Sequence, residues 1–287
     1  MSGQPKNKHT DISLIENMPK ISFIEVASSQ GCLDKNLGTE LFPAHLRKFL
    51  LKQFPKSVIN KAKVINSDFD STSKNIEDIA QSYFLKKSFV PFFIGGDHSI
   101  TFPIISAFSK INKKNRRKIG LIVFDAHVDC TSDFLAPSHE DIIRSIAKEN
   151  LVKPENILLL GIRKIYDIEK KFLKNDKIGK KIRIIRASQI TNPKKIKKTQ
   201  TFLHNFLTNL DSVYVSIDID VFDPKIVPGT GYLVSKGLLE KEFFALLSII
   251  LKSKKALGFD LVEINPKKDI KNRTFLLSKK IIKRILC

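Results

Sequence analysis

The sequence is poor in cysteine and lacks any long apolar run. Its three cysteines, Cys32, Cys130 and Cys287, are widely separated and give no disulfide framework. The most apolar helical stretch, Glu242–Ser253, is too short to span a bilayer. The opening residues, MSGQPKNKHTD, lack the apolar core of a signal peptide. These absences predict a protein of the reducing cytoplasm that has no membrane partner.

Acidic residues are also scarce relative to basic ones, so the formal net charge is +21. The lysines gather at residues 110–118, 170–183 and 192–200, between apolar segments where helix ends and loops belong. Such a charge admits a polyanionic partner such as nucleic acid. No aromatic residues are interleaved with these clusters, however, and the pattern favours a solvated surface over nucleic-acid binding.

Short apolar runs alternate with helical patterns along the whole chain. Most of the runs are continuously apolar, as expected of strands that are covered on both faces of a parallel sheet. The predicted strands are residues 21–26, 62–66, 90–94, 119–124, 156–162, 183–187, 213–219 and 256–264. The predicted helices are residues 43–54, 74–86, 99–110, 139–149, 196–209, 236–253 and 273–285.

This alternation predicts an α/β fold, a three-layer α/β/α arrangement around a mostly parallel eight-stranded sheet. No Gly/Ser linker, internal repeat or low-complexity block divides the chain. We therefore expect a single domain over residues 1–287, with residues 1–11 as a disordered tail.

Acidic and histidine residues follow four of the predicted strands. The runs are GGDHS (95–99), DAHVD (125–129), DIDVFDP (218–224) and EINP (263–266). Ligands bind at the carboxyl ends of strands in open parallel α/β sheets. Each run alone has an ordinary explanation, such as a glycine turn, a plain loop or an Asp-Pro turn. Together, on four strand ends, they predict one site.

Six side chains in these runs have the chemistry of metal ligands. If the chain stays extended, Asp125, His127 and Asp129 point the same way, since side chains alternate with period two. Two imidazoles and four carboxylates are too many for one ion but suit two divalent ions, whose charge the carboxylates balance. Ligation dominated by oxygen, without cysteine, favours Mn²⁺ over structural Zn²⁺, although Fe²⁺, Co²⁺ or Ni²⁺ also suit it. The predicted ligands are His98, Asp125, His127, Asp129, Asp218 and Asp220.

These motifs resemble those of the ureohydrolases, the arginase–agmatinase family of dinuclear manganese enzymes. The resemblance rests on GGDHS, DAHVD and SIDIDVFDP (216–224) with PGTG (228–231), and extends to GFDLVEINP (258–266) and NRTFLLSKKII (272–282). It spans nearly the whole chain. It implies an arginase/deacetylase-like fold, two Mn²⁺ ions, hydrolysis of a small guanidino compound to urea and an amine, and a trimeric or hexameric homo-oligomer.

The resemblance also implies a role for each ligand. His98 and Asp129 would bind one ion, His127 and Asp220 the other, and Asp125 and Asp218 would bridge the pair.

Further roles follow from the same resemblance. Glu263 falls where the family has a carboxylate that meets the guanidinium, and carboxylates hold planar cations well. His139 falls where the family has a proton-carrying histidine, and Asp220 is a second candidate for proton transfer. Asp97 and Asp223 are predicted to orient imidazoles or backbone, with a simple Asp-Pro turn as the alternative for Asp223.

The remaining histidines and Cys130 lie outside these roles. We expect Cys130 to serve packing alone. His9, His45 and His204 fall in no motif and are expected at the surface or in helices.

The substrate is less well specified. The short loop from Asp129 to His139 favours an agmatinase-like enzyme, with an arginase or another guanidino-acid or formimidoylglutamate hydrolase as the alternative. Glu140 and Asp141 replace the family's Gly-Thr, either to bind a second cationic group or to begin a helix, where acids favour the dipole. Residues 231–238, GYLVSKGL, also depart from the family pattern and reshape a pocket wall.

Three other classes compete with this interpretation. A two-metal phosphoesterase needs a later Gly-Asn-His, which the chain lacks. A deacetylase-like zinc enzyme needs one metal, whereas the six-ligand set suits two. A non-catalytic binder would have no need of the complete ligand set together with Glu263.

Overall fold

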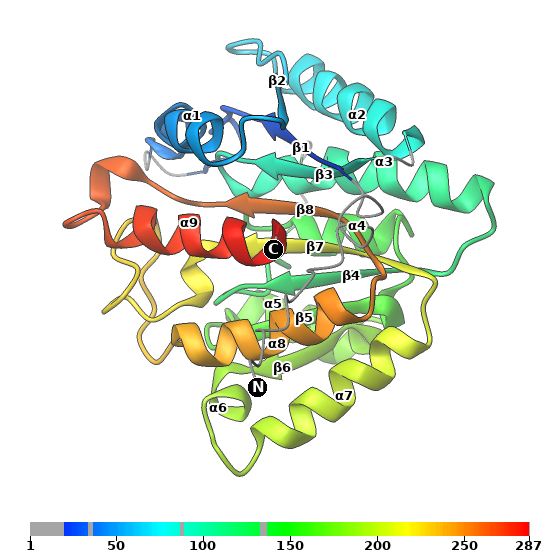
Figure 1. Cartoon of the computed structure of the whole chain (residues 1–287). Coiled ribbons are helices and arrows are strands. Elements are labelled where there is room, and N and C mark those ends of the chain that lie inside the picture. Colours follow the sequence, from blue (N-terminus) through cyan, green and yellow to red (C-terminus); the bar gives the residue numbers. More distant parts are fainter. Residues whose placement is uncertain (1–19, 34–36, 87–88, 133–136, 287) are drawn as a thin grey trace, which may run out of the picture.

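The protein is built on one sheet of eight parallel strands (Figure 1). Its computed structural model describes residues 20–33, 37–86, 89–132 and 137–286. The strand order across the sheet is β2-β1-β3-β8-β7-β4-β5-β6. In chain order the strands are β1 (Lys20–Glu25), β2 (Val58–Lys61), β3 (Phe89–Ile94), β4 (Ile119–Phe124), β5 (Ile157–Ile162), β6 (Arg183–Arg186), β7 (Ser212–Asp218) and β8 (Ala256–Val262).

The central strands are apolar on both faces because helices cover the sheet on both sides. In β4, Ile122 and Phe124 point into one core, while Leu121 and Val123 point into the other. The period of two along each strand thus divides a continuous apolar run between two cores. All six residues of β4 are buried, as are all six of β5 and all seven of β7.

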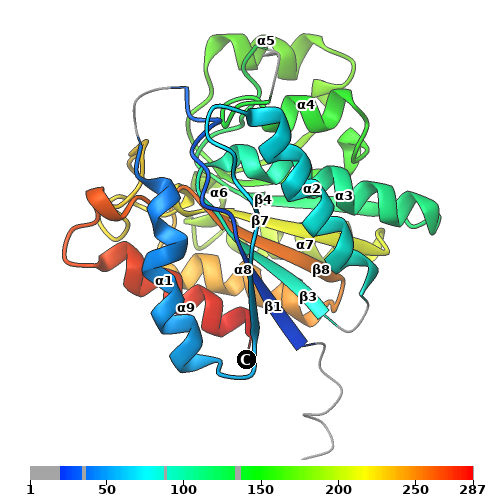
Figure 2. The same cartoon turned by 90° about the horizontal axis from the view of Figure 1, so that it is seen from above.

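Nine α-helices of the described residues form the two outer layers (Figure 2). One layer contributes to the core that contains Phe124, and its helices are α1 (Phe42–Gln53), α6 (Ala187–Ile190), α7 (Ile196–Thr208), α8 (Glu240–Lys252) and α9 (Arg273–Leu286). The other layer packs on the opposite face, and its helices are α2 (Phe69–Leu85), α3 (Thr101–Lys114), α4 (Ile142–Lys148) and α5 (Asp167–Asn175). Among the described residues no helix combines the length and the apolarity needed to cross a bilayer.

The predicted three-layer α/β/α class with an eight-stranded sheet is confirmed, and every described strand pairing is parallel. The prediction of a strand over residues 62–66 was wrong, because β2 ends at Lys61. As an edge strand that pairs only with β1, β2 is half-exposed and lacks the apolar run that marks the other strands.

Two helices were not predicted. Five of the nine residues of α5 are charged, so its sequence lacks the apolar content expected of a packed helix, and α6 has only four residues. The helix predicted from residue 74 begins earlier, at Phe69, because Asp68 caps it by accepting a hydrogen bond from Ser71 N. The predicted tail, residues 1–11, and His9 within it lie outside the described residues.

The sheet order brings distant sequence motifs together. Strands β3, β8, β7 and β4 are neighbours in the middle of the sheet, although they lie far apart along the chain. Because all strands run in the same direction, their carboxyl ends lie at one edge. Four motifs therefore meet at that edge: GGDHS after β3, EINP after β8, DID at the end of β7, and DAHVD after β4.

The loop after β3 approaches the loop after β1 too closely for a side chain at Gly96. A Cβ built there would lie 1.7 Å from Ser28 O. The neighbouring hydrogen bonds, Asp97 N to Ser28 O (3.0 Å) and Glu263 N to Gly96 O (2.8 Å), fix both sides of this contact. Glycine at this position therefore permits the packing that places His98 and Glu263 at the sheet edge.

We predict that Gly96→Ala lowers the free energy of unfolding by about 2–3 kcal/mol, because the added methyl group forces backbone apart. Urea unfolding followed by circular dichroism measures this loss. A change below about 0.5 kcal/mol would contradict the close approach.

Candidate metal centre

The six predicted ligands meet at the carboxyl ends of the central strands. Asp218 is the last residue of β7, and Asp125 directly follows β4. His98 begins the 3-10 helix η3 (His98–Ile100) that follows β3, and Asp220 lies within η6 (Ile219–Val221). Two groups have ligand atoms within 4.8 Å of one another: one is His98, Asp125 and Asp218, and the other is Asp125, His127 and Asp220.

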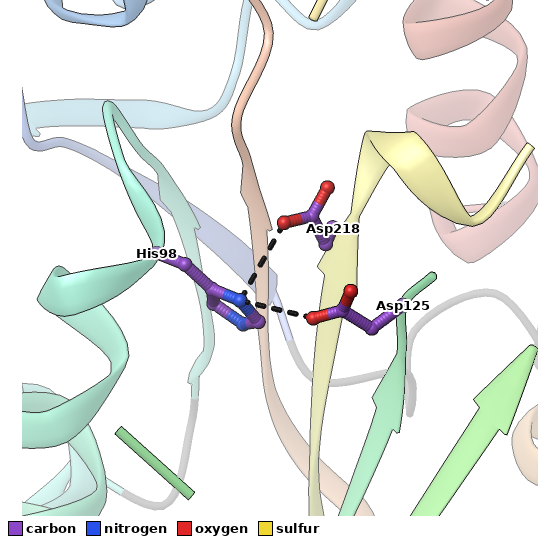
Figure 3. A group of neighbouring side chains, drawn as sticks. All are labelled: His98, Asp125 and Asp218. Atoms are coloured by element: carbon purple, nitrogen blue, oxygen red, sulfur yellow. Dashed lines mark ion pairs between the residues drawn. The ribbon is translucent and has the colours of Figure 1, made fainter. Parts of the chain in front are cut away.

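The first group is arranged around the imidazole of His98 (Figure 3). His98 Nδ1 lies 3.2 Å from Asp125 Oδ2 and 3.5 Å from Asp218 Oδ2. Asp129 is in neither group of three, but its Oδ2 lies 3.0 Å from the same nitrogen. Three carboxylates from two segments, the one after β4 and the end of β7, thus face one ring nitrogen.

The second group is arranged around His127. His127 Nδ1 lies 2.8 Å from Asp220 Oδ2 and 3.5 Å from Asp125 Oδ1. Asp125 is shared by the two groups, as a bridging ligand is, whereas Asp218 belongs only to the first. The predicted pairing of Asp129 with His98 and of Asp220 with His127 agrees with these contacts.

The backbone that carries these side chains is not extended as expected. Asp129 has a φ of 45°, in the left-handed region, and the segment that follows β4 is irregular. Asp125 Oδ1 accepts a hydrogen bond from His127 N (2.6 Å), which turns the chain directly after the strand. The three side chains therefore converge through a turn, and the prediction that they alternate along a strand was wrong.

The orientation of His98 fits a cation at this position. Its Nε2 lies 2.9 Å from Ser216 Oγ, and Ser216 Oγ donates to Asp260 Oδ1 (2.6 Å). Because the serine proton is engaged by Asp260, Ser216 accepts from Nε2–H, and a neutral ring keeps its lone pair on Nδ1. Among the described residues, Nδ1 finds no partner with hydrogen-bond geometry.

A buried lone pair that faces three carboxylates is repulsive unless a proton or a metal cation lies between them. Burial lowers the pKa of His98, but Asp125 and Asp129 outweigh it and raise that pKa well above its usual range, so a proton can take the place of the cation when no metal is bound. The donors are nitrogen and oxygen only, and all six ligand candidates are fully or largely buried. The residues therefore fit a pair of divalent cations.

The pKa values of the ligand side chains also show that the centre carries an excess of negative charge. Burial and the charge of Asp125 raise the pKa of Asp129 to about 8. Burial and the charges of Asp220 and Asp125 raise the pKa of Asp218 well above its usual range. Burial lowers the pKa of His127, but Asp220 and Asp125 outweigh it and raise that pKa to about 12. Without a metal, the centre thus retains protons.

Glu263 and His139 lie beside the metal centre. Glu263 Oε1 accepts from His98 N (2.8 Å) and contacts His139 Nδ1 (3.3 Å). Glu263 has a φ of 62°, a left-handed backbone conformation that non-glycine residues adopt only occasionally. Burial lowers the pKa of His139, but the hydrogen bond and charge of Glu263 outweigh burial and raise that pKa to about 9.

The other predicted positions have plainer roles. Asp97 caps η3 by accepting from Ser99 N (2.9 Å) and also accepts from Gly31 N, so it orients backbone. Asp223 accepts from Lys225 N, as in an Asp-Pro turn, and from Gly237 N fourteen residues along the chain, so it orients backbone, and it contacts no imidazole of the described residues. Cys130 is buried and donates to Val128 O. His45 and His204 are exposed on α1 and α7.

The two acids after His139 differ from each other. Asp141 is buried and is the N-cap residue of α4, and its Oδ1 accepts from Ser138 N (2.6 Å) and Ser138 Oγ (2.7 Å). The helix-start interpretation therefore fits Asp141. Glu140, in contrast, lines the pocket over the metal centre.

Several lining residues of this pocket were not predicted. The most informative is Tyr232, whose ring lies 6.0 Å from that of His127 and 5.8 Å from that of His139. It lies in the segment after PGTG, whose departure from the family pattern was the only signal. The described lining residues are His98, His127, Asp129, Thr131, His139, Glu140, Tyr166, Glu169, Asp218, Asp220, Thr230, Tyr232 and Glu263.

Comparison with known proteins decides the family. A family model described as the arginase family matches residues 32–287. The chain belongs to the arginase family. It is 30% identical to an arginase of Staphylococcus aureus (strain MSSA476) over 292 residues, covering 90% of this chain and 94% of that protein.

Solved structures of arginase-family proteins share the fold. The formimidoylglutamase of Bacillus subtilis superposes with a TM-score of 0.82 at 19% identity, covering 94% of this chain and 86% of that one. A putative agmatinase of Clostridium difficile gives a TM-score of 0.77 at 25% identity, covering 93% and 95%. The predicted family and the predicted enzyme class, a metal-dependent hydrolase of guanidino C–N bonds, are confirmed.

We predict that the metal-free protein loses stability as pH rises from 6 to 8.5, by roughly 2–4 kcal/mol. Asp129 and Asp218 have raised pKa values and so bind protons more tightly when folded than when unfolded. His127, also raised, adds to the same slope above its ordinary pKa. Saturating Mn²⁺ displaces these protons, so the stabilisation that it gives should grow over the same range.

Urea unfolding at several pH values, with and without Mn²⁺, measures how the free energy of unfolding changes with pH in the metal-free and in the Mn²⁺-loaded protein. Asp218→Asn should flatten the metal-free slope, and Asp223→Asn should leave it unchanged. Stability of the metal-free protein that stays level or rises with pH would contradict the account.

Proposed function

We propose that the protein is a dinuclear manganese hydrolase that cleaves a guanidino compound to urea and an amine, with agmatine as the substrate class. The observation that carries the metal chemistry is the pair of three-residue groups that share Asp125 at the carboxyl ends of neighbouring strands. When bound there, two divalent cations supply an activated water close to the guanidino carbon.

The protein's own residues provide the remaining parts of the reaction. The Glu263 carboxylate, at the pocket wall and fixed by His98 N, is placed to hold a planar guanidinium. His139 lines the same pocket, and Glu263 raises its pKa to about 9 in the metal-free protein, which makes it the first candidate to give a proton to the departing amine. Asp220, which faces His127, is a second candidate for this proton transfer.

The charge of the pocket supports a substrate with a cationic tail. Among the described lining residues none is lysine or arginine, whereas Glu140 and Glu169 add acidic groups beyond the metal centre. Glu169 is occupied by Cys130 N and Tyr166 N, which leaves Glu140 as the acid best placed to meet a cation. Agmatine carries an ammonium at the end opposite its guanidinium, so it matches this pocket.

Arginine is the second candidate. The similarity to arginases of Staphylococcus aureus favours it. Thr230 lines the pocket and offers a neutral hydroxyl to an α-carboxylate, whereas the Thr131 hydroxyl already donates to Glu140 O (3.0 Å).

The remaining expectations stay proposals. We infer from the family that the protein works in the cytoplasm as a trimeric or hexameric homo-oligomer. The lysine clusters fall between apolar segments, where solvated surface lysines are expected, and this supports the expectation that nucleic acid is not a partner.

We predict that Mn²⁺-loaded protein releases urea from agmatine faster than from arginine, guanidinobutyrate or guanidinopropionate, and faster than it releases formamide from formimidoylglutamate. Asp129→Ala and Asp218→Ala should each reduce turnover at least 10³-fold and lose bound metal, because each leaves buried charges of the centre unbalanced. A metal-free Asp218→Ala variant that retains turnover would overturn the mechanism.

We predict that Glu140→Gln lowers kcat/KM for agmatine about tenfold, through loss of a charge-assisted contact of roughly 1.4 kcal/mol. The same change should leave guanidinobutyrate unaffected or improved, because its tail is a carboxylate. Glu149→Gln, at the far end of α4 and absent from the pocket lining, is the matched control. Equal losses for both substrates would exclude tail recognition by Glu140.

A further inference from the structure

Arg163, which follows β5, binds backbone carbonyls of two segments at the metal centre. Its Nη2 donates to Asp220 O (2.6 Å) and Phe222 O (3.0 Å), and its Nη1 to Val221 O (3.1 Å). Nε and Nη2 both donate to Val234 O, at 3.1 and 2.9 Å. A further contact reaches Gly161 O, and no carboxylate of the described residues forms an ion pair with it.

The first of these segments is the turn that presents Asp220. The last carbonyls of a short helix such as η6 have no partner within the helix and carry partial negative charge. Arg163 binds three successive carbonyls at the end of this turn, of which that of Val221 also accepts from Leu238 N (3.0 Å). The Asp220 carboxylate faces Ala126 N (2.9 Å) and His127 Nδ1 (2.8 Å). The guanidinium therefore fixes the backbone from which this carboxylate projects.

The second segment is the pocket wall that departs from the family pattern. Val234 lies two residues after Tyr232, whose ring contacts His127 and His139. One side chain thus fixes both the turn that carries Asp220 and the wall that carries Tyr232.

The backbone at Gly161 permits this approach. Gly161 has a φ of 100°, and a Cβ there would lie 2.5 Å from Val221 Cγ2 and 3.0 Å from Asp125 O. The end of β5 can therefore lie directly against η6 and the end of β4, which brings Arg163 within reach of both turns.

We propose that Arg163 is a positioning residue that sets the second cation site, His127 with Asp220, and couples it to the Tyr232 wall. The planar guanidinium reaches five carbonyls at once, whereas a lysine ammonium has three donors at a single point. A lysine at this position, which keeps the positive charge, should therefore not restore the contacts of Arg163. The role concerns the apoprotein's geometry, so it is testable whether or not agmatine is the substrate.

The experiment uses the full chain with Arg163→Lys, Arg163→Met and the control Arg183→Met. Arg183 also donates to a backbone carbonyl, that of Glu155 (3.0 Å), but it is exposed and lies outside both the pocket lining and residues 219–236. Hydrogen–deuterium exchange of the metal-free proteins reports on residues 219–236. Calorimetric titration with Mn²⁺ then reports on the two cation sites.

We expect both Arg163 variants to exchange residues 219–236 at least tenfold faster than the parent and to bind the second Mn²⁺ at least tenfold more weakly. The affinity for the first Mn²⁺, and both measurements on the Arg183→Met protein, should remain within twofold of the parent. If Arg163→Met does not fold, Arg163→Lys still decides the matter. Parent-like exchange of residues 219–236 in a folded Arg163 variant would overturn the proposal, even if no protein in the series bound Mn²⁺.

Discussion

Repulsion among buried carboxylates is the constraint on which the rest of the site depends. Asp125, Asp129, Asp218 and Asp220 lie together at the sheet edge with two imidazoles and little solvent. Such a group is unstable unless cations or protons balance its charge. Around it the backbone is fixed from several directions, by the close contact at Gly96 and the carbonyl contacts of Arg163. These contacts fix the backbone segments that carry the ligands.

The parallel sheet makes this concentration of charge possible. Its strand order places β3, β8, β7 and β4 side by side, so that segments more than a hundred residues apart contribute to one centre. Both faces of the sheet are buried under helices, and the strands are therefore rigid platforms for the ligands. The irregular turns after the strands, at Asp129 and Glu263, then aim individual side chains.

Sequence patterns predicted the parts of the molecule that depend on strong local signals. Buried strands such as β4 were found because their apolar runs are continuous, and the six ligands because they follow such strands. The edge strand β2 was missed because it is half-exposed, and the helix α5 because it is short and mostly charged. The role of Arg163 was beyond prediction because its partners are backbone carbonyls, which leave no trace in the sequence. Tyr232 reaches the centre only through tertiary packing.

The most direct test of the account is calorimetric titration of Mn²⁺ into the metal-free protein and its Asp125→Asn variant. Because Asp125 belongs to both groups, the parent should bind two ions per chain and the variant should lose tight binding of both. Binding of two ions with unchanged affinity by a folded Asp125→Asn protein, or of none by the folded parent, would contradict the claim that these residues form a dinuclear centre.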